Sequence, residues 1–276
     1  MTDSWTPAEP DLEQIRSDHA DPLASLARGD IPAILLRQAY PVDHCDGLIS
    51  RFIQQELIDD PATRDAGGSR KRIDIGTSLG NRGNDQPGFF AHADGTRELF
   101  SGLFDSFINP VSLIYDTLSA LDPSRTVCTA YEPDGRTYGP AIFRIHYEGH
   151  RYPPHIDHVT LREKRFDYAV TRFKHQFAGV LCMQNTAPSG QATQSILHRC
   201  FWTPELQPFI KSDTFYDYAE ENGVSRFQVD LEPGDLYFFN TGLIHEVPAL
   251  TGENPRVVLA VFIGYSEDDR EIFVWS

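Results

Sequence analysis

The chain has 276 residues, of which 40 are acidic and 24 basic, so its formal net charge is −16. That sign of charge argues against a protein that binds the phosphate backbone of nucleic acids. The length allows one large domain with a sizeable core, and 18 Phe and 11 Tyr can fill the interior of a β-rich fold.

Four cysteines occur without a C-x-x-C pair, which favours buried free thiols in a reducing compartment. No apolar run reaches the length of a membrane span, and no signal-peptide core follows Met1. We therefore expect a soluble, cytoplasmic protein that is not bound to a membrane. The sequence does not indicate the oligomeric state.

The N-terminal part predicts helices that support a sheet. Residues 1 to about 28 are acidic and interrupted by prolines, so we expect them to lie loosely on the surface. A short apolar strand is predicted at 31–36. A helix follows Pro41, with Asp43 as its N-cap.

The next stretch, 60–95, is rich in Gly, Asp, Asn and Arg and predicts a long connection, of a kind that is often a functional loop. Only 72–75 within it has the pattern of a strand. Apolar residues return to helical spacing from 95 to 121, with a break or kink at Pro110.

From residue 126 the pattern changes to short runs bounded by turns. The runs T-V-C-T-A-Y and A-I-F-R-I-H-Y flank the turn sequence P-D-G-R, which predicts two antiparallel strands. This series indicates a mainly β fold with supporting helices, built as a sandwich or double-sheet jelly roll. We expect a single domain over 1–276, with helical and sheet support in 1–125 and the β-rich core in 126–276. Further strands are predicted at 178–184, 227–231, 236–240, 257–265 and 272–275.

A metal site is predicted around the triplet H-I-D. His155 and Asp157 can aim two ligand groups at one point, because residues i and i+2 of a strand share a face. His245, in a distant strand, would complete a two-histidine, one-carboxylate set, which suits Fe(II) and leaves coordination positions open. Arg256 follows at an offset from which it could make a bidentate salt bridge to a dicarboxylate co-substrate.

H-I-D, the run G-D-L-Y-F-F-N-T-G-L-I-H-E-V and the following arginine resemble the Fe(II)/2-oxoglutarate-dependent oxygenases. Within that superfamily the chain is most similar to hydroxylases of N-substituted amino acids and to the related aliphatic halogenases. The resemblance implies a double-stranded β-helix (a cupin-like jelly roll) and the use of Fe(II), 2-oxoglutarate and O2. It also implies that His155, Asp157 and His245 bind the iron and that Arg256 holds the far carboxylate of 2-oxoglutarate.

Two further residues are candidates at this site. His146 lies where related enzymes often have a tyrosine that reaches the same carboxylate, although an ordinary half-buried strand histidine fits the position equally well. Arg165 belongs to a basic stretch, 158–175, which could form a helical lid and bind a carboxylate of the substrate. The alternative for that stretch is a solvated helix face.

The sequence thus predicts an enzyme that hydroxylates an aliphatic C–H of a small molecule, an amino-acid derivative that could carry a carboxylate. Halogenases of the resembled group have Gly or Ala where Asp157 stands, so the carboxylate favours hydroxylation over halogenation. Desaturation by the same class of enzyme stays open. The alternative from another class is a non-catalytic jelly-roll binding protein.

Overall fold

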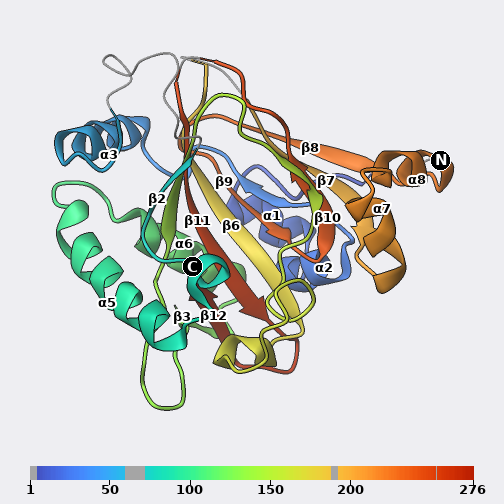
Figure 1. Ribbon diagram of the computed structural model, residues 1–276, viewed down its shortest axis with the longest axis horizontal. Helices are drawn as coiled ribbons and strands as arrows, with labels where there is room; N and C mark the ends of the chain where they lie inside the picture. Colours follow the sequence, from blue (N-terminus) through green and yellow to red (C-terminus); the bar gives the residue numbers. More distant parts are fainter. Residues whose placement is uncertain (1–4, 60–71, 188–191, 253) are drawn as a thin grey trace.

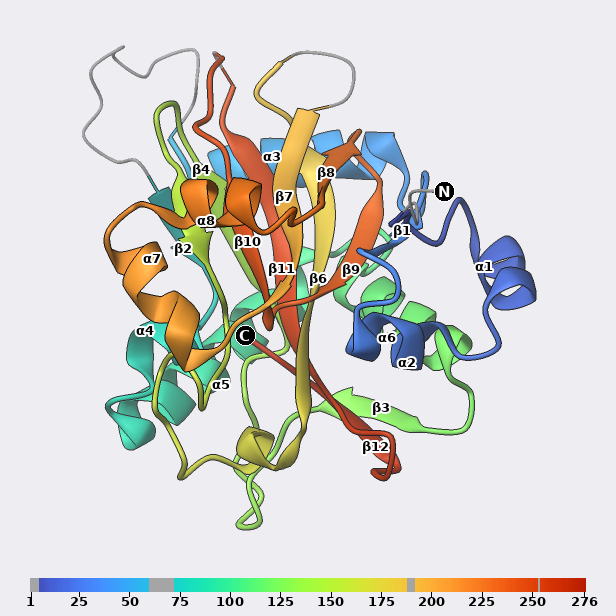
Figure 2. The same cartoon turned by 90° about the vertical axis from the view of Figure 1, so that its right-hand side faces the viewer.

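The computed structural model describes residues 5–59, 72–187, 192–252 and 254–276. Within these ranges, eight strands form a large sheet and four form a smaller one (Figures 1 and 2). The strands are β1 (Ile34–Leu36), β2 (Arg72–Ile75), β3 (Thr126–Thr129), β4 (Ile142–His146), β5 (Tyr152–His155), β6 (His175–Gln184), β7 (Ala192–Phe201), β8 (Arg226–Leu231), β9 (Leu236–Asn240), β10 (Leu243–Val247), β11 (Arg256–Tyr265) and β12 (Glu271–Trp275).

The large sheet has the order β1-β9-β6-β11-β12-β3, with β4 beside β11 and β2 beside β4; the small sheet has the order β5-β10-β7-β8. Strands β1 and β2 of the N-terminal part pair with β9 and β4. The helices are α1 (Leu12–Asp18), α2 (Pro22–Arg28), α3 (Val42–Gln54), α4 (Leu79–Arg82), α5 (Gln86–Leu103), α6 (Pro110–Leu121), α7 (Gln207–Lys211) and α8 (Phe215–Glu221), with 3-10 turns η1 (Ala169–Arg172) and η2 (Pro204–Leu206).

Side-chain alternation divides the large sheet into two faces. On β4, Phe143 and Ile145 join the core beneath the helices, whereas Arg144 and His146 line a cavity between the sheets. On β11, Val257 packs in the helical core while Val258 faces the small sheet. The sheet is therefore buried on both sides, which is why β6 and β11 are almost continuously apolar.

Helices cover the outside of both sheets. In Figure 1, α3 and α5 lie on the left, outside the large sheet, and α7 and α8 lie on the right beside the small sheet. Helices α1, α2, α3, α5 and α6 all contribute to the largest apolar core, which they share with β2, β4, β6, β9 and β11. A smaller core between the sheets includes Val180, Leu197 and Tyr237 and packs beside the cavity.

The structure corrects two expectations for the N-terminal part. Residues 12–28 are not loosely placed but form α1 and α2, whose N-caps Asp11 and Asp21 accept bonds from backbone N–H groups. Helix α3 begins after Pro41, and Asp43 lies in its first turn rather than at the N-cap. The strand at 72–75 and the helix break at Pro110 are confirmed.

The expectation of a long connection over 60–95 is wrong from residue 79 onward, where α4 and α5 begin. Its first part, 60–71, lies outside the described residues. The expected hairpin around 133–135 is also wrong. A single bridge, Tyr131–Thr137, spans that turn, while β3 pairs in parallel with β12 and β4 pairs with β2 and β11.

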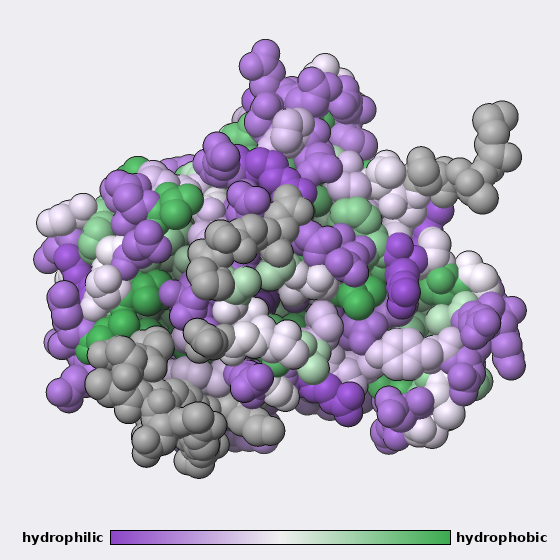
Figure 3. All heavy atoms as spheres, turned by 90° about the horizontal axis from the view of Figure 1, so that it is seen from above, coloured by the Kyte–Doolittle hydropathy of each residue, from purple (hydrophilic) through white to green (hydrophobic). Residues whose placement is uncertain are grey.

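Viewed from above, the surface is mostly hydrophilic, and apolar side chains occur in small groups (Figure 3). In the described ranges, no helix combines the length and the apolar character needed to cross a bilayer.

Candidate active site

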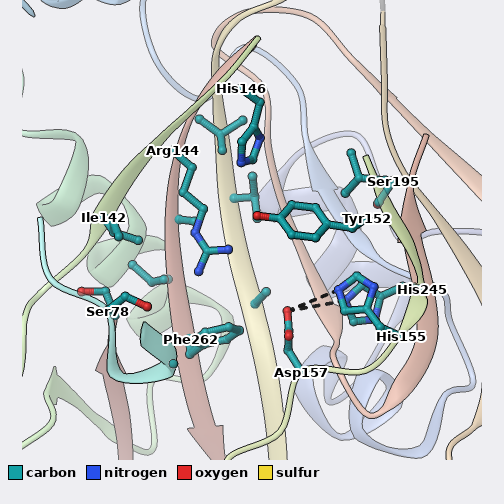
Figure 4. A pocket seen from close by; sticks show the side chains of 18 of the residues that line it. Ser78, Ile142, Arg144, His146, Tyr152, His155, Asp157, Ser195, His245 and Phe262 are labelled. Carbon is teal, nitrogen blue, oxygen red and sulfur yellow. Dashed lines mark ion pairs between the residues drawn. The ribbon is translucent and has the colours of Figure 1, made fainter. Parts of the chain in front are cut away.

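A cavity of about 280 Å³ lies between the two sheets. Strands β4 and β11 supply one wall, and β5 and β10 supply the other. Figure 4 shows His155, His245 and Asp157 together on the second wall, facing Arg144, Ile142 and Phe262 across the cavity. The cavity thus brings together side chains from distant parts of the chain.

The three predicted ligand residues meet at one point. His155 ends β5 and is the direct register partner of His245 on β10. Asp157 lies two residues beyond the end of β5, where its backbone N–H donates to Thr241 O at 3.1 Å. Its Oδ2 lies 3.8 Å from Nε2 of His155 and 3.7 Å from Nε2 of His245. Such a group could hold a metal ion, since all three ligand atoms lie within 4.8 Å of one another.

Backbone carbonyls fix how the two imidazoles are protonated. Nδ1 of His155 contacts Pro153 O at 2.7 Å, and Nδ1 of His245 contacts Leu243 O at 2.8 Å. A carbonyl only accepts, so each Nδ1 must donate, and in the neutral ring each Nε2 keeps its lone pair. Both lone pairs therefore point toward the carboxylate of Asp157, as in metal sites whose ligands are oriented by outer hydrogen bonds.

These donors need a cation between them. Burial lowers the pKa of His245, with a further contribution from His155, so this imidazole resists protonation. Two imidazole lone pairs and one carboxylate oxygen around one point match the ligand preference of Fe(II).

Arg162 approaches the triad from the following turn. One Nη donates to Asp157 Oδ1 and also, at 2.9 Å, to Ile156 O. The second oxygen, Oδ2, is the one that faces the two histidines. The two carboxylate oxygens thus have different partners, which leaves Oδ2 available as a single-atom ligand.

Arg256 and His146 form a second polar group in the cavity. They are direct register partners on β11 and β4, and Arg256 Nη1 donates to His146 Nδ1 at 3.1 Å. Arg256 is only 4% exposed, and in the described ranges its side chain bonds to Gln194 and His146 and forms no ion pair with a carboxylate. Because His146 Nδ1 accepts, its proton lies on Nε2, which is buried and has no hydrogen-bond partner in the described residues.

A relay of two amides orients Arg256. Its Nε donates to Gln194 Oε1 at 2.7 Å, and Gln194 Nε2 donates to Asn185 Oδ1 at 2.8 Å. Asn185 in turn donates to Leu231 O at 2.9 Å. The amide oxygen of Gln194 must therefore face the guanidinium. A buried arginine held by neutral groups keeps its full positive charge for a ligand.

The basic stretch 158–175 differs from the prediction. It consists of turns followed by η1, not of a helical lid. Arg165 pairs with Glu163, and its Nη2 donates to Gly80 O at 3.1 Å, so it ties the turn to α4. Its side chain does not line the cavity. This corrects the expectation that Arg165 meets the substrate, because its charge is already compensated by Glu163.

Sequence reasoning missed several residues of the cavity wall. Arg144 lies two residues before His146 on β4 and faces the same side, so strand alternation could have identified it. Arg72 and Tyr152 carried no such signal, because Tyr152 precedes two prolines and the pairing of Arg72 depends on the fold. Further wall residues that were not anticipated include Ser78, Asn81, Ser195, Tyr237, Phe239 and Phe262.

With this geometry in place, comparison with known proteins identifies the family. The model of the carrier-protein-independent halogenase WelO5 family matches residues 9–276. The chain belongs to this family. As a member of it, the chain is a 2-oxoglutarate-dependent non-heme iron oxygenase. Among curated proteins, none matches the sequence.

Solved structures agree on the fold. An N-substituted L-amino acid dioxygenase from Burkholderia ambifaria AMMD is 16% identical and superposes with a TM-score of 0.57, covering 92% of this chain and 90% of that one. The same enzyme in complex with α-ketoglutarate is 14% identical, with a TM-score of 0.57 and coverage of 93% and 91%. At this identity the likeness extends to the fold alone.

The state of His146 predicts how stability responds to pH. Burial, and then the charge of Arg256, lower the pKa of His146 far below its usual value. In the unfolded chain it protonates near its reference pKa of about 6.5. Below that pH the unfolded state binds a proton at His146 and the folded state does not. The free energy of unfolding therefore decreases as the pH falls.

We therefore expect His146→Gln to flatten the pH dependence of the free energy of unfolding. Between about pH 6 and pH 4 the variant should lose about 1.4 kcal/mol less per pH unit than the wild type. Urea unfolding at a series of pH values measures this difference. Parallel curves for the two proteins would show that His146 is protonated in the fold.

Proposed function

We propose that this enzyme hydroxylates an aliphatic C–H bond of a small molecule, an amino-acid derivative. The observation that carries the proposal is the carboxylate of Asp157, whose Oδ2 lies 3.7–3.8 Å from the Nε2 atoms of His155 and His245. We also propose that the two facing sheets form the double-stranded β-helix of the 2-oxoglutarate oxygenases, in one domain spanning 1–276. The fold shared with the dioxygenase from Burkholderia ambifaria supports that architecture.

His155, Asp157 and His245 would hold the iron, which fits their donor set. When bound, Fe(II) supplies the oxidising chemistry, with O2 as oxidant and 2-oxoglutarate as the two-electron reductant that leaves as succinate and CO2. The protein contributes the orientation of the ligands. The carbonyls of Pro153 and Leu243 hold the imidazoles, and Arg162 holds the outer oxygen of Asp157.

Arg256 would bind the far carboxylate of 2-oxoglutarate. It is buried, oriented by Gln194 and without an acidic partner in the described ranges, so it offers a planar pair of donors to a dicarboxylate. His146 would assist from the adjacent strand. It accepts from Arg256 at Nδ1, and its unpaired Nε2–H can donate to the same co-substrate.

Hydroxylation is favoured over halogenation by one side chain. The family model is that of a halogenase, yet Asp157 occupies the position where the halogenases it resembles have Gly or Ala. A carboxylate there fills the coordination position that a halide needs, and it offsets one charge of the metal. Desaturation remains an alternative outcome of the same site. A non-catalytic binding protein is disfavoured by the complete set of metal and co-substrate residues.

Iron-dependent turnover of 2-oxoglutarate tests the proposal. Wild-type enzyme with Fe(II) should form succinate, and His245→Ala should abolish it and lose stoichiometric iron. His175→Gln is a matched control, because His175 does not line the cavity. Thermal unfolding should remain cooperative in both variants. Full succinate formation in His245→Ala would contradict the assignment of the ligand.

Arg256 should determine affinity for 2-oxoglutarate and not for iron. Loss of one buried charged pair costs roughly 2–5 kcal/mol, so the KM for 2-oxoglutarate should rise tens-fold or more in Arg256→Ala. Arg256→Lys should recover only part of the affinity, because an ammonium cannot make the paired donation. Steady-state kinetics and iron titration separate the two effects. Unchanged KM in Arg256→Ala would mean that another residue binds the co-substrate.

A further inference from the structure

Four arginines line the active-site cavity, and they differ in whether their charge is compensated. Arg72 pairs with Asp74 at 2.6 Å and donates to Tyr152 Oη at 2.7 Å. Arg162 pairs with Asp157. For Arg256 and Arg144, the described ranges contain no carboxylate within 4.0 Å. Two arginines without an acidic partner in the described ranges, Arg144 and Arg256, therefore line one cavity of an otherwise acidic protein.

Arg144 is placed to meet a substrate. It lies on β4 between Ile142 and His146, all on the face that lines the cavity. In Figure 4 its guanidinium projects into the cavity from the wall opposite His155, His245 and Asp157. Its Nε is buried and has no hydrogen-bond partner in the described residues. A buried polar donor of this kind is costly unless a ligand satisfies it.

The charges in the cavity indicate that this ligand is an anion, and this step rests on the proposed function. Arg162 shares the single charge of Asp157 with the metal, but its side chain is 48% exposed, so water screens its charge. Without Arg162, Fe(II) and Asp157 together leave one positive charge, and Arg256 supplies a second. The two carboxylates of 2-oxoglutarate offset both, one at the metal and one at Arg256. Arg144 then remains positive in a cavity from which a bound substrate excludes water, where an unpaired charge is costly.

We propose that Arg144 binds a carboxylate of the substrate and thereby orients the C–H to be attacked toward the metal site. A planar guanidinium matches a carboxylate through two parallel hydrogen bonds. The cavity of about 280 Å³ suits a small molecule that reaches from Arg144 to the triad. Ile142, Ala260 and Phe262 line the same space and provide apolar contacts for its hydrocarbon part.

The experiment compares acids with matched amides as probes. Each probe is titrated by calorimetry into the anaerobic complex of enzyme, Fe(II) and 2-oxoglutarate. The probes are the N-acetyl derivatives of leucine, valine, isoleucine, methionine and phenylalanine, each as the free acid and as the primary amide. The acids should bind the wild type about tenfold or more tightly than the amides. Arg144→Met should abolish this preference, and Arg144→Lys should retain part of it.

Two controls separate Arg144 from other causes. Arg28→Met removes the same charge from an exposed side chain of α2 that pairs with Asp30, and this variant should keep the preference for acids. The affinity of Arg144→Met for 2-oxoglutarate, titrated before the probe is added, should stay within a few-fold of the wild type.

Three results would overturn the inference while the proposed function stands. They are an acid preference that survives in Arg144→Met, an equal loss of 2-oxoglutarate affinity in that variant, and failure of every acid to bind a wild-type complex that binds 2-oxoglutarate. Absence of iron-dependent 2-oxoglutarate consumption by the wild type would instead contradict the proposed function itself.

Discussion

Three electron-pair donors directed at one point constrain the whole site. Two neutral imidazoles and a carboxylate repel one another at 3.7–3.8 Å unless a cation lies between them. The protein keeps them there by pairing β5 with β10, so that His155 and His245 are register partners, and by fixing each Nδ1 on a backbone carbonyl. Side-chain alternation on the facing sheet then places the arginines of the opposite wall across the cavity.

Charge is distributed unevenly in this molecule. The chain as a whole carries −16, whereas the arginines that line the cavity outnumber its acidic side chains, Asp157 and Glu163. Arg72 is neutralised by Asp74, Arg162 shares the charge of Asp157 with the metal site, and Arg144 and Arg256 are held for ligands. An anionic co-substrate and an anionic substrate would each find one such cation, and the low dielectric of the cavity strengthens both attractions. Specificity for acids would then come from a limited number of fixed positive charges.

The metal triad could be predicted because its signal is local. His155 ends β5 and Asp157 lies two residues beyond it, so the short H-I-D spacing is enough to bring both side chains to one point. His245 and Arg256 were recognised from the motif around them. The predictions that were wrong concerned features that depend on tertiary pairing. The turn at 133–135 is real, but β3 found a parallel partner in β12, which no local pattern reveals. Arg165 was expected to bind the substrate, but in the fold it pairs with Glu163 and donates to the carbonyl of Gly80. Helices α1 and α2 were not predicted but could have been, since Asp11 and Asp21 are ordinary N-cap residues.

The family and the side chain at residue 157 point to different reactions, and product mass can distinguish them. The measurement is mass spectrometry of the product formed under isotope-labelled O2 in a buffer containing chloride, with any acid that the enzyme turns over. Because Asp157 fills the position that a halide needs, the product should gain one labelled hydroxyl oxygen and succinate the other labelled atom. A chlorinated product from the unmodified enzyme would contradict the role of Asp157 as a metal ligand, and with it the proposed hydroxylation.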